Sequence, residues 1–122
     1  MKNLLVIFLG GGIGSVGRYL LGTAIQRYVA TPFPAGAFVV NITGCFLIGL
    51  FYGLSLRHAW LTVEWRLFLV TGICGGYTTF SSFSYESVNL VREGNIGNFI
   101  TYISLSVAVG LLATFGGAAL AR

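Results

Sequence analysis

One segment of this chain combines a poor helix sequence with a dense set of hydroxyl groups. Residues 72–84 read GICGGYTTFSSFS and lie within an uncharged stretch that runs from 67 to 85. The glycines destabilise a helix, and the serine and threonine hydroxyls compete for backbone partners. Lipid cannot hydrate a broken backbone, so such a break occurs where protein buries it or where it lines a wet cavity. The segment therefore predicts a helix break on a pathway for a polar solute.

Two phenylalanines in this segment, Phe80 and Phe83, are three residues apart and so share one face of a helix. Aromatic rings carry a positive edge, and two edges directed into a cavity would favour a small anion and exclude cations. Phenylalanine in a membrane span is more often a lipid-facing or core residue, which is the alternative interpretation. The neighbouring hydroxyls of Thr79, Ser81 and Ser82 favour the anion pathway.

Two further polar side chains interrupt apolar stretches. Arg18 is an ionised group inside the first stretch, where charged groups are costly and face a cavity or a partner. It either raises the local anion concentration or pairs with carbonyl groups to hold helices together. Asn41 lies in the middle of the second stretch, and its amide either donates hydrogen bonds to an anion or bridges two helices.

Hydroxyl groups also follow one stripe of the last apolar stretch, at Tyr102, Ser106 and Thr114, with Gly110 completing the four-residue spacing. A row of hydroxyl donors predicts a polar track along an otherwise apolar helix. The alternative is that the serine and threonine bond to their own helix. Glu86 lies toward the end of the third span, and we interpret it as an interfacial, solvated carboxylate.

Composition indicates what positions these residues. The chain has 122 residues, of which 56% are hydrophobic and 8% charged, far below the roughly 25% charged residues of soluble domains. About 20 apolar residues cross the hydrocarbon as a helix. We expect a single all-α, polytopic membrane domain, 1–122, with four transmembrane helices, the third of them broken. The expected spans are 3–28, 33–56, 65–91 and 95–121.

Other classes of function find little support in the sequence. The G-x-G-x-x-G pattern at 12–17 lies inside an apolar span, and the first acidic residue of the chain is Glu64, so it is not a dinucleotide site. Neither a carboxylate pair, a nucleophile with its base nor a metal-ligand cluster is visible, and we expect no enzyme. Cys45 and Cys74 are interpreted as small packing residues.

Basic residues give only a weak orientation signal. The side that carries both termini has four lysines and arginines, and the opposite side has two. This small difference supports two alternatives about equally: all copies insert in one orientation, or copies insert in both orientations. The residues of the first side are Lys2, Arg57, Arg66 and Arg122, and those of the second are Arg27 and Arg92.

The sequence resembles the Fluc (CrcB) fluoride channels in three motifs. These are GGGIGSVGRY at 10–19, Asn41 within VNITGC at 40–45, and GGYTTFSSFS at 75–84. The resemblance covers the whole chain, including its length and its four spans. The third motif is highly specific, whereas the first alone is weak.

The resemblance implies a passive channel of the inner (plasma) membrane that exports fluoride and confers fluoride resistance. It implies an antiparallel, dual-topology homodimer with two fluoride pathways, and a structural sodium ion held by the backbone carbonyls of Gly75 and Thr78 of both subunits. Arg18 would lie at a cytoplasm-facing vestibule. Family members often carry serine where this chain has Gly110. The implied pathway residues are Asn41, Thr79, Phe80, Ser81, Ser82, Phe83, Tyr102, Ser106 and Thr114.

Two alternatives are left open at this point. A small multidrug exporter, driven by protons, has a similar length and helix count, but it needs a carboxylate within the first span, where this chain has Arg18. A membrane assembly subunit without transport activity is the other alternative.

Overall fold

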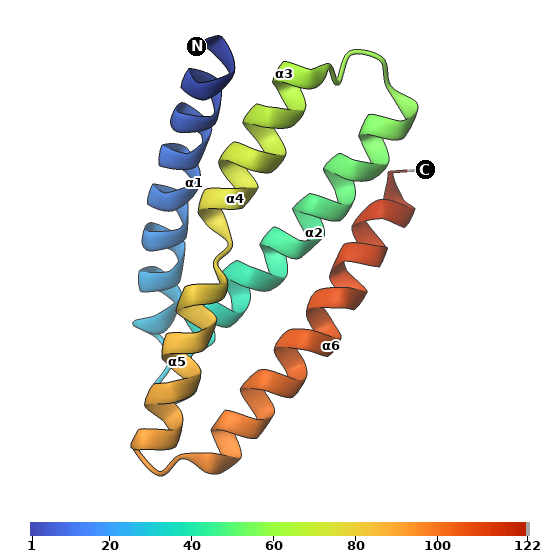
Figure 1. Cartoon of the computed structure of the whole chain (residues 1–122). Coiled ribbons are helices and arrows are strands. Elements are labelled where there is room, and N and C mark those ends of the chain that lie inside the picture. Colours follow the sequence, from blue (N-terminus) through green and yellow to red (C-terminus); the bar gives the residue numbers. More distant parts are fainter. Residues whose placement is uncertain (122) are drawn as a thin grey trace.

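The computed structural model describes residues 1–121, and nearly all of them are helical (Figure 1). Three helices are long and apolar enough to cross a membrane. They are α1 (Lys2–Gln26), α2 (Ala35–Arg57) and α6 (Ile96–Leu120). The remaining span is divided into shorter pieces, so the prediction of an all-helical membrane protein with a broken third span is confirmed.

The third span consists of two helical rods. The first rod runs without interruption through α3 (Val63–Arg66), the π-helix η1 (Leu67–Cys74) and α4 (Gly75–Tyr77). Thr78 and Thr79 then adopt extended backbone conformations, with φ/ψ of −94°/150° and −154°/131°. The second rod, α5 (Phe80–Arg92), begins directly after them. The break therefore falls inside the segment that the sequence indicated.

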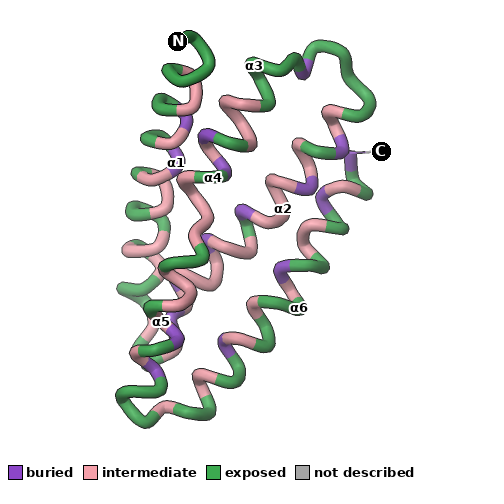
Figure 2. Tube along the Cα trace, viewed as in Figure 1, coloured by how far each residue is buried: buried purple, intermediate pink, exposed green. Residues whose placement is uncertain are grey.

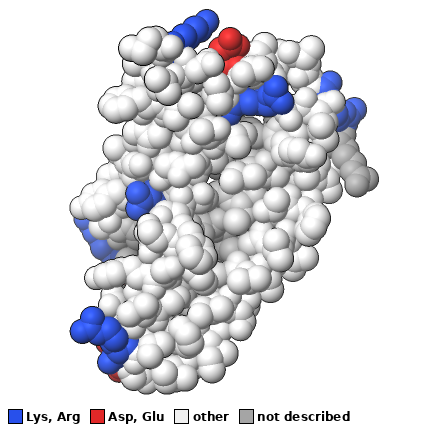
Figure 3. Space-filling model, viewed as in Figure 1, with Lys and Arg blue, Asp and Glu red and all other residues white. Residues whose placement is uncertain are grey.

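The spans run up and down, so that both ends of the chain lie at the same end of the bundle, together with the connection between α2 and α3 (Figure 1). The connections α1–α2 and α5–α6 lie at the opposite end. Gly94, in the turn between α5 and α6, has a φ of 79°, which glycine adopts without strain. On the face seen in Figure 3, charged side chains gather mainly toward the two ends, with a largely uncharged surface between them.

Glycines hold the helices close together. A Cβ at Gly49 of α2 would fall on the Thr114 carbonyl oxygen of α6, and one at Gly117 would fall on the Phe46 carbonyl oxygen. Small residues allow this backbone approach, which is how membrane helices pack. The few buried residues accordingly lie where helices meet, while much of each helix faces outward (Figure 2).

The first rod of the third span is fixed on α1 in the same way. A Cβ at Gly10 would lie 2.7 Å from the Phe68 carbonyl oxygen, and one at Gly72 would lie 2.9 Å from the Gly10 Cα. The second rod departs from α1 after the break, which opens space beside α5. This geometry places the break between α1 and α2.

Candidate functional site

The helix break is capped by its own threonine. Thr79 is the N-cap of α5, and its Oγ1 accepts hydrogen bonds from the backbone N–H of Ser81 at 3.1 Å and of Ser82 at 3.5 Å. A capping threonine satisfies donors that the first turn of a helix leaves unpaired. The hydroxyl groups of Thr79 and Ser81 also lie 2.7 Å apart. The sequence TTFSS thus ends one rod and starts the next.

Two long-range hydrogen bonds fix the break to the first two helices. The backbone N–H of Thr79 donates to Asn41 Oδ1 of α2 at 3.2 Å. Arg18 of α1 donates from Nε to the Gly76 carbonyl oxygen at 3.2 Å. Both bonds use backbone groups that an unbroken helix would have paired internally. Asn41 and Arg18 therefore hold the break open from both sides.

The break removes the helical donors of several carbonyl groups besides that of Gly76, among them those of Gly75 and Thr78. In a continuous helix Gly75 would accept from the N–H of Thr79, and Thr78 would accept from that of Ser82. Those N–H groups instead donate to Asn41 and to the Thr79 hydroxyl. Among residues 1–121 no group of three His, Cys, Asp or Glu is placed to hold a metal ion. Gly75 is exposed beside the break.

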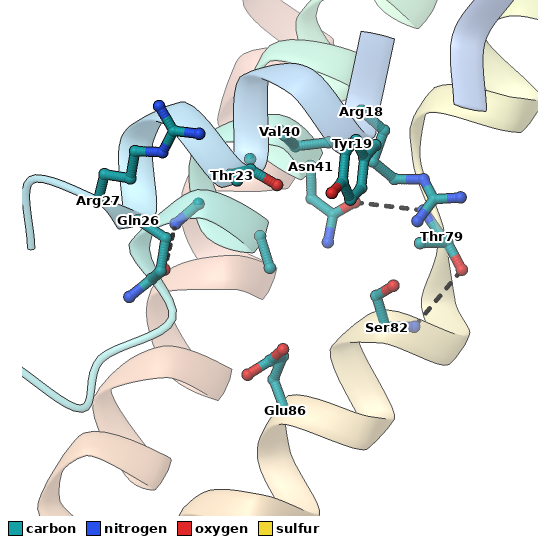
Figure 4. A pocket seen from close by; sticks show the side chains of 13 residues that line it. Arg18, Tyr19, Thr23, Gln26, Arg27, Val40, Asn41, Thr79, Ser82 and Glu86 are labelled. Carbon is teal, nitrogen blue, oxygen red and sulfur yellow. Dashed lines mark hydrogen bonds between the residues drawn. The ribbon is translucent and has the colours of Figure 1, made fainter. Parts of the chain in front are cut away.

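A cavity of about 510 Å³ opens between α1, α2 and α5; we call it the vestibule. Figure 4 shows its side chains, which include two arginines, two amides, several hydroxyls and one carboxylate. Its polar lining comes from Arg18, Tyr19, Thr23, Gln26, Arg27, Asn41, Thr79, Ser82 and Glu86. Gln26 braces one end, because its Oε1 accepts from the Gly36 N–H at 3.0 Å and its Nε2 donates to the Phe33 carbonyl at 3.3 Å.

A second cavity of about 300 Å³ lies on the other side of the break; we call it the phenylalanine cavity. Its lining residues are Asn41, Cys45, Thr78, Thr79, Phe80, Phe83, Ser106 and Val107. The centroids of the two phenylalanine rings are 5.6 Å apart with an interplanar angle of 41°. Asn41 and Thr79 line both cavities, so their hydrogen bond lies between the vestibule and the phenylalanine cavity; we call this position the neck.

The hydroxyl row on α6 divides into two parts. Tyr102 is completely buried, its ring packs on Phe83 at a centroid distance of 5.3 Å, and its hydroxyl has no hydrogen-bond partner among the described residues. Ser106 Oγ, also buried, is likewise unpaired within residues 1–121. Buried polar groups without partners are rare in proteins, so each one requires an explanation. Thr114 Oγ1 instead lies 3.1 Å from both the Cys45 and the Gly110 carbonyl oxygens.

Comparison with known proteins places this geometry in a family. The sequence model described as CrcB-like protein, Camphor Resistance (CrcB), matches residues 5–118. The chain belongs to this family. A CrcB-family relative from Flavobacterium psychrophilum is 49% identical over 122 residues, covering 100% of this chain and 98% of the relative. One from Phocaeicola vulgatus is 53% identical over 117 residues, 96% of each chain. Both relatives carry the name Fluoride-specific ion channel FluC.

The structure of this CrcB-family chain gathers most of the predicted pathway residues around the neck. Asn41, Thr79, Phe80, Phe83 and Ser106 line the phenylalanine cavity. Ser82 and Arg18 line the vestibule. Tyr102 contacts the first group through Phe83.

Three predicted pathway residues line neither cavity: Ser81, Thr114 and Tyr102, the last of which reaches the phenylalanine cavity only through Phe83. Ser81 is exposed and its hydroxyl pairs with Thr79. Thr114 bonds to backbone oxygens and lines a separate groove between α2, η1 and α6. Conversely, the sequence analysis interpreted Cys45 only as a packing residue, yet it lines the phenylalanine cavity. The available signal was its position four residues after Asn41, on the same helix face.

Proposed function

We propose that this chain is a passive, fluoride-selective channel that lets fluoride leave the cytoplasm and so confers fluoride resistance. One observation carries the proposal: two cavities share the Asn41–Thr79 neck as a common wall, and near it lie two phenylalanine rings and the buried hydroxyls of Tyr102 and Ser106, which are unpaired among residues 1–121. The names of the relatives supply the identity of the ion. The activity is ion transport rather than catalysis, and the bacterial relatives place it in the plasma membrane.

The donors around the neck suit an anion that must give up water. Fluoride is small and strongly hydrated, so the protein has to replace its hydration shell. Conduction requires that binding favours entry into the pathway but stays weak enough for release. An amide, hydroxyls and ring edges provide several weak contacts in place of one strong contact. A negative-inside potential drives an anion outward by about 2.3 kcal/mol per 100 mV.

Arg18 fits this scheme as a residue of the entrance. It lines the vestibule and is absent from the lining of the phenylalanine cavity, and its Nε is occupied by the Gly76 carbonyl. A fixed cation there raises the local anion concentration by electrostatic focusing. Because it lies off the neck, it does not trap the ion at the narrowest segment.

We further propose that two copies assemble in antiparallel orientation, each completing the other's pathways. The break is the supporting feature, because lipid cannot satisfy its backbone groups and they need protein or water around them. Gly75 and Ser81 are exposed beside the break, and Phe80 is 77% exposed in the single chain. A second copy would cover this face. The weak bias of the basic residues is compatible with insertion in both orientations.

A structural sodium ion at the centre of such a dimer is compatible with the residues present. The Gly75 and Thr78 carbonyls lack their helical donors, as described above, and four such oxygens meet if the breaks of two copies cross. Oxygen atoms are the ligands that hard cations prefer. The ion would supply positive charge that neutralises converging carbonyl dipoles. The backbone carbonyls of Gly75 and Thr78 from each copy would hold the sodium ion.

Fluoride efflux from proteoliposomes, followed with a fluoride electrode, tests the proposed function. The purified chain should release fluoride after a potassium ionophore collapses the opposing potential, and it should release chloride much more slowly. Absence of flux would favour an assembly subunit, and proton-driven uptake of cationic dyes would favour an exporter. Either result would overturn the proposal.

Linked dimers test the orientation separately. Both termini lie at one end of the bundle (Figure 1), so a direct fusion of two copies keeps them parallel. Insertion of one additional transmembrane helix between the copies inverts the second. The inverted fusion should conduct fluoride and the direct fusion should not. Equal fluoride flux from both fusions would contradict the antiparallel arrangement, provided that direct fusions do not pair with one another in opposite orientations.

A further inference from the structure

We propose that the thiol of Cys45 lines the fluoride pathway and supplies the polar contact that the hydroxyl row of α6 lacks at Gly110. This inference rests on the proposed function and extends it to a residue of α2 that the sequence pattern assigned to packing. Three observations carry it: the gap in the row, the position of the sulfur atom beside that gap, and the Ser106 hydroxyl, which lines the same cavity and is unpaired among residues 1–121.

The gap follows from the spacing on α6. Tyr102, Ser106 and Thr114 place hydroxyls at intervals of four or eight residues, and Gly110 occupies the missing step. Residues four apart lie one above the other on a helix face. An anion that moves along this face would therefore lose contact with α6 for about two helical turns, which is costly for an ion already stripped of water.

The sulfur of Cys45 lies directly beside that gap. A Cβ built on Gly110 would lie 3.5 Å from Cys45 Sγ, which is ordinary van der Waals contact. The backbone of the same residue reaches the next step of the row, because Thr114 Oγ1 donates to the Cys45 carbonyl at 3.1 Å. Cys45 also lines the phenylalanine cavity together with Ser106. Cys45 thus lies between Ser106, which shares its cavity, and Thr114, whose hydroxyl is already bonded to the Cys45 backbone.

The surroundings of Cys45 indicate a ligand rather than an apolar contact. Ser106 Oγ and the hydroxyl of the fully buried Tyr102 have no partner among residues 1–121. Ser106 lines the same cavity as Cys45, and its hydroxyl is a donor that an anion in that cavity would satisfy. A neutral thiol is a weak donor that extends the same set. Cys45 is a free thiol in this structure.

The other cysteine provides a matched control. Cys74 is also free, but it is 0% exposed and lines neither the vestibule nor the phenylalanine cavity. A packing role predicts similar consequences for loss of either sulfur. A pathway role predicts that fluoride flux responds to Cys45 alone.

The test combines substitutions with a thiol reagent in the proteoliposome efflux assay. Cys45→Ala should lower fluoride flux about three- to tenfold, the loss expected for one weak donor, whereas Cys45→Ser should retain wild-type flux. The double variant Cys45→Ala/Gly110→Ser moves the donor from α2 to α6 and should restore most of the flux. Methyl methanethiosulfonate, which caps the thiol and removes its proton, should reduce flux in wild type and in Cys74→Ala but not in Cys45→Ser.

The outcomes separate this inference from the proposed function. A wild-type protein without fluoride flux overturns the proposed function itself. A conducting wild type, with unchanged flux both in Cys45→Ala and after the reagent, overturns only the role of Cys45. If Cys45→Ala does not fold, the reagent acts on already folded protein and decides alone: inhibition of Cys74→Ala supports the inference, and continued flux refutes it.

Discussion

Asn41→Asp places a negative charge at the neck while leaving the fold intact. The Asn41 Oδ1 atom accepts the Thr79 N–H at 3.2 Å, and a carboxylate oxygen accepts the same hydrogen bond. The side chains are nearly identical in size, so the break keeps its support from α2. What changes is that an amide able to donate to an anion becomes a group that repels it. We therefore expect normal assembly and loss of fluoride flux.

The size of the effect follows from the position of Asn41 in both cavities. An ion that passes a residue lining the neck comes within about 4 Å of it, and two unit charges at that distance interact by about 4 kcal/mol at an effective dielectric constant of 20. Each 1.36 kcal/mol of barrier is about tenfold in rate. Flux should therefore fall by about three orders of magnitude, below the background leak of liposomes.

Fluoride-electrode efflux from proteoliposomes measures this loss, with size-exclusion profile and thermal stability as checks on folding. Asn95→Asp is the matched control, because it makes the same chemical change at the N-cap of α6, away from both cavities. It should conduct like the wild type, since an acidic residue is favourable at a helix N-terminus. If a well-folded Asn41→Asp conducts within a few fold of wild type, the neck does not lie on the ion path.

Three further outcomes are expected. Phe80→Ile or Phe83→Ile should sharply reduce fluoride flux without loss of assembly, because the ring edges disappear but the apolar volume remains; unchanged flux in both variants refutes the aromatic contact. Gly49→Ala should lower the free energy of unfolding by at least about 1–3 kcal/mol, because its Cβ would fall on the Thr114 carbonyl. Gly116→Ala, whose Cβ would have no neighbour within 4 Å among the described residues, should leave the same thermal melt unchanged. Replacement of sodium by a large organic cation during purification should lower the melting temperature of the proposed dimer, and an identical melt in both buffers contradicts a structural ion.

The sequence predicts the fold well because each feature has a local cause. The low charge content and long uncharged stretches define the spans, and the glycines and hydroxyls of 72–84 locate the break. The shared face of Phe80 and Phe83 follows from helix geometry, and the structure places their ring centroids 5.6 Å apart. These predictions need only composition or spacing within one element, and the fold class, the break and the shared face hold in the structure.

Contacts between elements were beyond the reach of the sequence. That Asn41 accepts from the Thr79 backbone depends on the register of α2 against the break, which no local pattern sets. The position of Cys45 beside Gly110 depends in the same way on the register of α2 against α6. The π-helix η1 was also not predicted, since no residue type in Leu67–Cys74 requires the wider turn.

Arg18 illustrates how tertiary structure resolves alternatives that sequence leaves open. An arginine inside a membrane span can either attract anions or hold helices together. The structure allows one half-buried guanidinium to do both. The Nε–H donates to the Gly76 carbonyl freed by the break, and the same residue lines the vestibule. A guanidinium has five N–H donors in a rigid, planar arrangement, so one bond to the backbone fixes the direction of the rest. A lysine has no such geometry, and it would keep the charge without orienting it. The helix break and the entrance cation are therefore a single structural unit, because the carbonyl that the break releases is the group that orients the cation.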